Sequence, residues 1–161
     1  MSIREANHRL DRILYRGKVT VALTCCVINR GQLFLSKEVF QKFERYLLEA
    51  LEKHGVFAHV YLFMPDHLHL LLEGDHVESD VLAAVVLFKQ KSGYWLSKSG
   101  RTDRWQKDFH DHILRSDEDV LKQVRYILEN PVRAGIVDSW EEYPYKGSTV
   151  YDLTNPDFFL R

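Results

Sequence analysis

Two apolar runs separated by a two-residue break most strongly constrain how this chain folds. The runs occupy residues 56–64 and 68–72, and Pro65-Asp66 lies between them. Proline and aspartate favour turns, so the pattern predicts an antiparallel hairpin with strands at 56–64 and 67–73. Side chains two residues apart on a strand share a face, so His67 and His69 should project side by side. Two imidazoles fixed in this way would form half of the ligand shell of a divalent metal.

The remaining pattern predicts an α+β chain. β-branched and apolar residues indicate a strand at 19–28, and a short strand is expected at 109–114. Apolar residues at helical spacing predict helices at 36–54 and 79–96. A third helix should begin at Ser116, a potential N-cap, and end near Asn130 because Pro131 cannot continue it. This order fits a ferredoxin-like antiparallel sheet with helices packed on one face.

Length and composition fit one soluble domain over residues 1–161, with a core at about 19–137 and an irregular aromatic tail at 138–161. No apolar run is long enough to span a membrane, and the N-terminus lacks the apolar segment of a secretory signal. Cys25 and Cys26 are adjacent and would face opposite sides of a strand, which indicates neither a shared metal nor a disulfide framework. We therefore expect a cytoplasmic protein with reduced thiols.

The charge distribution suggests a polyanionic partner. The net charge of −1 alone argues against nucleic-acid binding. However, segment 88–107 has six basic residues and one acid, for a local charge of +5, and residues 1–18 carry +3, which leaves −9 elsewhere. Aromatic residues lie among these bases, as in single-strand binders, although a solvated helix face would explain the charge alone. The DNA-contacting candidates are Arg101, Arg104, Trp105, Lys107, Arg115 and Arg133.

The third predicted helix carries a tyrosine on an unexpected face. At about 100° per residue, its apolar side chains form one stripe, and Tyr126 falls roughly opposite that stripe. Asn130 follows four residues later and shares the side of Tyr126. This face therefore presents a phenol and an amide oxygen to something other than the core of the helix. His110 and His112 also share a strand face, but they lack a matched third ligand, which favours satisfied or DNA-facing histidines.

Three motifs in order resemble one family. His67-Leu68-His69 looks like the HUH motif of single-tyrosine transposases, and residues 64–71 resemble their "MPNHxHLL" signature. Residues 105–109 and 126–135 resemble the "WQ…F" and "YI..NPV.AG" segments of the REP-associated tyrosine transposases. The resemblance covers roughly residues 19–137. One departure is Asp66, where the family usually has Asn, and a carboxylate there could tighten metal binding or repel a phosphate.

The resemblance implies the HUH endonuclease fold and a role for each matched residue. It implies that His67, His69 and Asn130 bind a divalent metal, Mg²⁺ or Mn²⁺, and that Tyr126 is the nucleophile. It also implies single-stranded DNA with a palindromic, REP-like hairpin as substrate, and a bacterial, nucleoid-associated protein. A metal held by two nitrogens and one oxygen can polarise a phosphate for attack, and imidazole favours Mn²⁺.

Three functions remain open from the residues alone: a transposase, a non-catalytic nucleic-acid binder of ferredoxin-like fold, and a metal-dependent hydrolase using the His-x-His pair. Helix projection also leaves open whether Tyr126 serves the histidines of its own chain or those of a partner in a homodimer.

Overall fold

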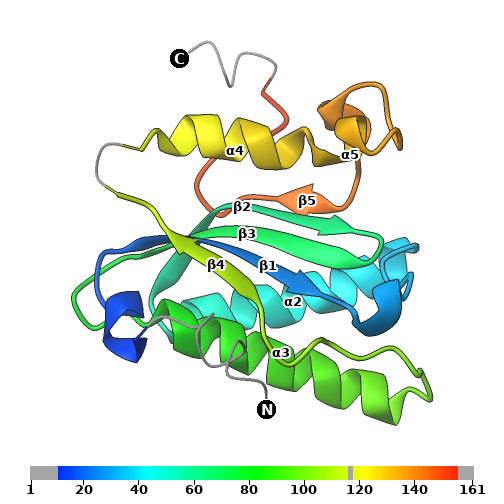
Figure 1. The fold of residues 1–161 in the computed structure, drawn as a ribbon, viewed down its shortest axis with the longest axis horizontal. Helices are drawn as coiled ribbons and strands as arrows, with labels where there is room; N and C mark the ends of the chain where they lie inside the picture. Colours follow the sequence, from blue (N-terminus) through cyan, green and yellow to red (C-terminus); the bar gives the residue numbers. More distant parts are fainter. Residues whose placement is uncertain (1–10, 116–117, 156–161) are drawn as a thin grey trace.

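The computed structural model describes residues 11–115 and 118–155. Figure 1 shows that the strands form one sheet and that the α-helices pack against it. The elements in chain order are η1 (Arg12–Tyr15), β1 (Thr20–Cys26), η2 (Ile28–Arg30), α2 (Lys37–Lys53), β2 (Val56–Met64), β3 (His67–Gly74), α3 (Val81–Lys98), β4 (His110–Ile113), α4 (Val120–Leu128), α5 (Asn130–Arg133), η3 (Trp140–Glu142) and β5 (Lys146–Gly147).

The sheet confirms the predicted α+β class and ferredoxin-like arrangement. Its strand order is β4-β1-β3-β2-β5, and every pairing of neighbouring strands is antiparallel. The predicted β2–β3 hairpin is confirmed, and Met64 pairs with His67 across the two-residue turn. Strand β1 lies between β3 and β4, so residues from three separate parts of the chain become neighbours at this end of the sheet.

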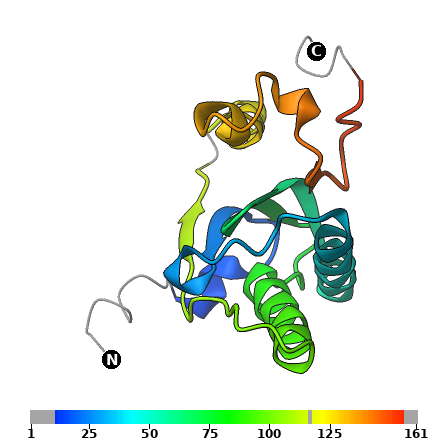
Figure 2. The ribbon, with the colours of Figure 1, turned by 90° about the vertical axis from the view of Figure 1, so that its right-hand side faces the viewer.

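Helices cover both faces of the sheet, as Figures 1 and 2 show, with α2 and α3 on one side and α4 on the other. The prediction of helices on one face holds for α2 and α3 and is wrong for α4. The reason lies in β2, which is buried at eight of its nine positions. Because alternate side chains point to opposite faces, such a strand must be covered on both sides.

Each face has its own apolar core. The α2–α3 side contains residues such as Phe43, Phe88 and Leu70. The α4 side joins the buried stripe of the helix to the other face of the sheet and consists of Val60, Leu62, Met64, Leu71, Val124, Ile127, Leu128, Trp140 and Tyr143. His67 and His69 share the face of Leu71, so they lie on the α4 side of the sheet.

Local signals set most of the helix ends. Helix α2 begins as predicted, because the Ser36 hydroxyl accepts a hydrogen bond from the backbone N–H of Val39. Helix α4 begins later than predicted, with Asp119 as its N-cap, and the expected cap Ser116 lies outside the described residues. Pro131 ends α4 as expected but sits in the first turn of the short helix α5, where its missing N–H costs nothing.

The tail is more ordered in structure than its sequence suggests. Strand β5 pairs with the edge of β2, and the buried Tyr143 hydroxyl donates a hydrogen bond of 2.5 Å to the carbonyl oxygen of Phe63. His59 is also buried, and its Nδ1 atom lies 2.9 Å from the Tyr151 hydroxyl. Residues 140–151 therefore complete the second core. None of the described helices is long and apolar enough to cross a membrane.

Candidate active site

His67 and His69 converge as the strand pattern predicts. Both lie on β3 directly after the Pro65-Asp66 turn, and their Nε2 atoms are 3.0 Å apart. The turn itself is held in place, because the Pro65 carbonyl accepts hydrogen bonds from two backbone N–H groups of the loop before α2. The turn that precedes the two rings is therefore hydrogen-bonded to a neighbouring loop.

Each ring is also oriented through its other nitrogen. The Nδ1 atom of His67 lies 2.6 Å from Asp66 Oδ1, and the Nδ1 atom of His69 lies 3.2 Å from the Thr24 hydroxyl. When these oxygens accept from Nδ1–H, the proton is held there and the Nε2 lone pairs face each other. Asp66, the position that departs from the family pattern, thus contacts the ring of His67.

This geometry fits a divalent metal. Two nitrogens bound at right angles to one ion, each ~2.1 Å away, lie ~3 Å apart. The two Nε2 atoms already have that separation. Within residues 11–115 and 118–155, no three His, Cys, Asp or Glu side chains gather closely enough to hold a metal by themselves. A metal bound by the two histidines would therefore take further donors from another residue type, from water or from the substrate.

The electrostatics keep His69 available as a ligand. Burial, followed by the charges of His67 and Arg133, lowers the pKa of His69 to about 4. The ring is therefore neutral at physiological pH, which is the form that binds metals.

A cavity of about 390 Å³ opens over the pair, and its lining includes residues that sequence reasoning missed. Thr24 pairs with His69 on one side and with His110 on the other, so all three side chains lie on one face. Cys26 pairs with His67 in the same way. The full lining is Thr24, Cys26, Val27, Arg30, Asp66, His67, His69, Gln106 and His110. The alternation of side chains along a strand predicted that His110 and His112 share a face. It could not predict that β4 pairs with β1, which brings His110 beside Thr24.

Tyr126 does not line this cavity. Its side chain is 63% exposed, which confirms that it is off the packing stripe of α4. The Arg133 guanidinium carbon lies 4.1 Å from the centroid of the Tyr126 ring, and Arg133 Nη2 donates to the Tyr126 carbonyl at 2.7 Å. Asn130 donates from Nδ2 to the Ile127 carbonyl, which leaves its amide oxygen as the atom able to bind a metal.

The predicted DNA-contacting residues lie in three places, one of which is the position of Arg133 against Tyr126. Arg101, Arg104, Trp105 and Lys107 cluster around the segment that follows α3, where Arg104 donates to the carbonyls of Arg101 and Asp103. Trp105 is half-buried, packs on Phe34 and Phe88, and donates from its indole N–H to Ser92. Arg115 lies elsewhere, near Glu118, which also accepts from His112. His112 is thus a satisfied histidine, one of the two roles expected for it.

A family model described as "Transposase IS200 like" matches residues 16–130. The chain belongs to the IS200-like transposase family. The matched range contains His67, His69, Tyr126 and Asn130. The chain is also 28% identical over 93 residues to an inferred REP-associated tyrosine transposase of Haemophilus influenzae, a match that covers 51% of this chain and 53% of that protein. The chain therefore spans about half the length of this curated relative.

Solved structures show the same transposase fold. One is described as a REP-associated tyrosine transposase bound to a REP hairpin, with a TM-score of 0.71 and 21% identity over 86% of this chain and 81% of that chain. Another is an inferred transposase from Deinococcus radiodurans, with a TM-score of 0.50 and 21% identity over 70% of this chain and 90% of that chain. At these identities, the likeness establishes the shared fold.

Proposed function

We propose that this IS200-like transposase cuts and rejoins single-stranded, hairpin-containing DNA through a covalent bond between Tyr126 and a 5′ phosphate. The observation that carries the proposal is the 3.0 Å separation of the His67 and His69 Nε2 atoms, each ring being oriented through Nδ1. A hairpin of REP type is the favoured substrate, since the structural neighbour is described as bound to one and the curated relative is named for the same element.

We assign a separate role in this reaction to each side chain around the histidine pair and Tyr126. His67 and His69 would hold Mg²⁺ or Mn²⁺, with the Asn130 amide oxygen as a third donor. When bound, such an ion polarises a phosphate oxygen and offsets the charge that builds on it during attack. Asp66 and Thr24 keep the two imidazoles oriented. Arg133, stacked on Tyr126, limits the positions of the phenol and adds positive charge near the phosphate.

The reaction proceeds without an external energy source. The phenol oxygen of Tyr126 forms a bond to phosphorus as the bond from phosphorus to the 3′ oxygen breaks. The phenol proton is released, and the departing oxygen takes up a proton to become a 3′ hydroxyl. Because one phosphate ester replaces another, attack by that hydroxyl or another reverses the step and rejoins a strand.

The remaining basic candidates, Arg101, Arg104, Lys107 and Arg115, would contact the phosphate backbone.

A covalent adduct is the decisive test. The protein is incubated with hairpin-bearing single-stranded DNA and Mn²⁺, and the products are separated on a denaturing gel. An adduct should form with the wild type and disappear in Tyr126→Phe and His67→Ala. Tyr94→Phe is the matched control, because Tyr94 is similarly exposed but lies on α3. Cleavage that survives Tyr126→Phe would favour a metal-dependent hydrolase, and binding without cleavage would favour a non-catalytic DNA binder.

A further inference from the structure

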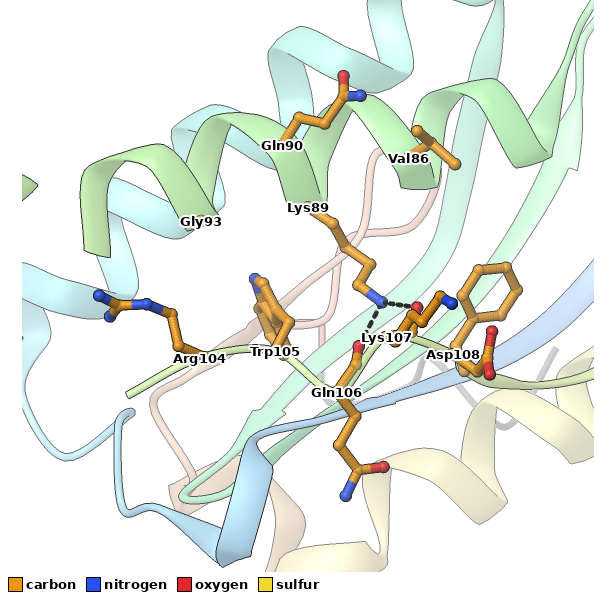
Figure 3. A pocket seen from close by; sticks show the side chains of 10 residues that line it. Val86, Lys89, Gln90, Gly93, Arg104, Trp105, Gln106, Lys107 and Asp108 are labelled. Atoms are coloured by element: carbon orange, nitrogen blue, oxygen red, sulfur yellow. Dashed lines mark hydrogen bonds between the residues drawn. The ribbon is translucent and has the colours of Figure 1, made fainter. Parts of the chain in front are cut away.

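A second cavity lies beside the segment that follows α3, and the chemistry proposed above leaves it without a role. It has a volume of about 430 Å³ and opens between helix α3 and residues 104–109. Figure 3 shows Gly93 on the helix side and Trp105 on the facing segment, with Lys89 reaching across between them. The cavity is distinct from the one over the histidine pair, although Gln106 lines both.

The walls of this cavity combine flat apolar surface with positive charge. Phe109 is buried, and the half-buried Trp105 is fixed by core aromatics and by its hydrogen bond to Ser92. Lys89 Nζ lies 5.5 Å from the centroid of the Phe109 ring and donates to the carbonyls of Gln106 and Lys107 at 2.7 and 3.1 Å. Three basic side chains, Lys89, Arg104 and Lys107, outnumber the one carboxylate of the lining, Asp108. An apolar slot with this excess of positive charge suits an unpaired base with its phosphate outside.

The cavity also lies within reach of the histidine pair. Residues 104–106 cross the end of β1, where the Gln106 N–H donates to the Cys26 carbonyl and the Arg104 carbonyl accepts from Ile28. The Gln106 side chain points away from α3 in Figure 3, while its backbone faces the cavity. One extended segment therefore separates the two cavities. A single strand that crosses this segment passes from one cavity to the other.

We propose that the cavity between α3 and residues 104–109 takes one unpaired nucleobase of the DNA strand whose phosphate lies at the histidine pair. This inference rests on the proposed function and adds a means of reading sequence beside the cut. The base enters the slot next to Trp105, and Arg104 and Lys107 hold its flanking phosphates. Sequence choice at that nucleotide is then set by the shape of the cavity, independently of hairpin pairing.

Gly93 allows the cavity to be filled without damage to the fold. A Cβ added to Gly93 meets no atom within 4 Å, and the residue lies inside a helix. Glycine is unfavourable in helices, so Gly93→Leu should fold at least as stably as the wild type while its side chain occupies the cavity. Ser97→Leu is the matched control, because it adds the same side chain to the same helix one turn further on, at an exposed residue outside the cavity lining.

The test measures binding of hairpin DNA with single-stranded flanks by fluorescence anisotropy in EDTA, with each flank nucleotide made abasic in turn. When one particular flank nucleotide is abasic, the wild type and Ser97→Leu should bind the DNA roughly tenfold more weakly. A loss of this size is expected when one stacked base is removed. Gly93→Leu should bind the intact DNA roughly tenfold more weakly and respond little to the abasic change at that position.

The outcomes separate this inference from the proposed function. If Gly93→Leu is folded by circular dichroism and retains the wild-type affinity and abasic profile, the nucleobase site is refuted. Adduct formation by the wild type would then still support strand cleavage at Tyr126. Failure of the wild type to bind hairpin DNA at all would overturn both proposals.

Discussion

The guanidinium of Arg133 lies over the ring of Tyr126, with its central carbon 4.1 Å from the ring centroid. A second contact, from Arg133 Nη2 to the Tyr126 carbonyl, fixes the same arginine to the backbone of α4. Stacking of this kind needs the flat, delocalised guanidinium, which a lysine ammonium cannot replace. Arg133 therefore holds the ring of the proposed nucleophile against the end of its own helix.

Arg133→Lys should slow formation of the protein–DNA adduct roughly tenfold, because it keeps the charge but releases the phenol from its fixed position. Single-turnover rates at saturating DNA give the measurement. Arg125→Lys, a change at an exposed residue of α4, the helix of Tyr126, is the control and should react at the wild-type rate. An Arg133→Lys rate equal to that of the wild type would mean that the stacking does not position the nucleophile.

Asp66→Asn should weaken Mn²⁺ binding by roughly tenfold, the lower end of the effect seen when a partner of a metal-bound histidine is changed. Asn can still accept from His67 Nδ1–H, but it lacks the negative charge that makes the ring a stronger ligand. Calorimetric titration with Mn²⁺ in the absence of DNA measures the affinity. Tighter binding by Asp66→Asn would show that the carboxylate does not support the metal site.

The stability of the metal-free protein should fall in acid because of His69. Its pKa in the folded protein is about 4, below the ordinary value of 6.5, so the unfolded chain takes up the proton first. The contribution of His69 is intact above about pH 6.5 and is lost as the pH falls towards about 4, by up to about 3 kcal/mol.

Urea unfolding in EDTA between pH 7.5 and 4.5 measures this loss. Wild type should lose stability more steeply than His69→Gln, whereas His76→Gln, in an exposed loop, should follow the wild type. Equal slopes for wild type and His69→Gln would contradict the prediction.

Tyr151→Phe should lower the free energy of unfolding by about 1 kcal/mol, because it removes a partner of the buried His59 ring. The same ring lies 3.4 Å from Glu73, so one hydrogen-bonding partner remains. Urea unfolding provides the measurement, with Tyr94→Phe as an exposed control that should be neutral. No loss in Tyr151→Phe would indicate that the hydrogen bond between Tyr151 and His59 does not stabilise the fold.

Mixing two inactive variants tests which chain supplies the nucleophile. Tyr126 is exposed and does not line the histidine cavity of its own chain, so we expect it to serve the histidines of a partner in a homodimer. A mixture of Tyr126→Phe and His67→Ala should then regain adduct formation, because one composite site has both groups intact. An inactive mixture, with dimers demonstrated by light scattering, would place both groups in one chain.

Local sequence determined the parts of the site that depend on periodicity. The alternation of side chains on β3 predicted that His67 and His69 share a face. Helical spacing predicted that Tyr126 lies outside the buried apolar stripe of α4. Ser36 fixed the start of α2 through its own side chain. These predictions succeeded because each depends on residues within a few positions of one another.

The tertiary structure determined which strands and helices lie next to these local elements. The pairing of β1 with both β3 and β4 brings Thr24 and His110 beside His69, and no local pattern encodes which strands become neighbours. The burial of both faces of β2 places α4 opposite α2 and α3. The short helix α5, which follows α4, then brings Arg133 over Tyr126. Strand order and layer order depend on how distant apolar surfaces cover one another, and that balance is settled only when the whole chain packs.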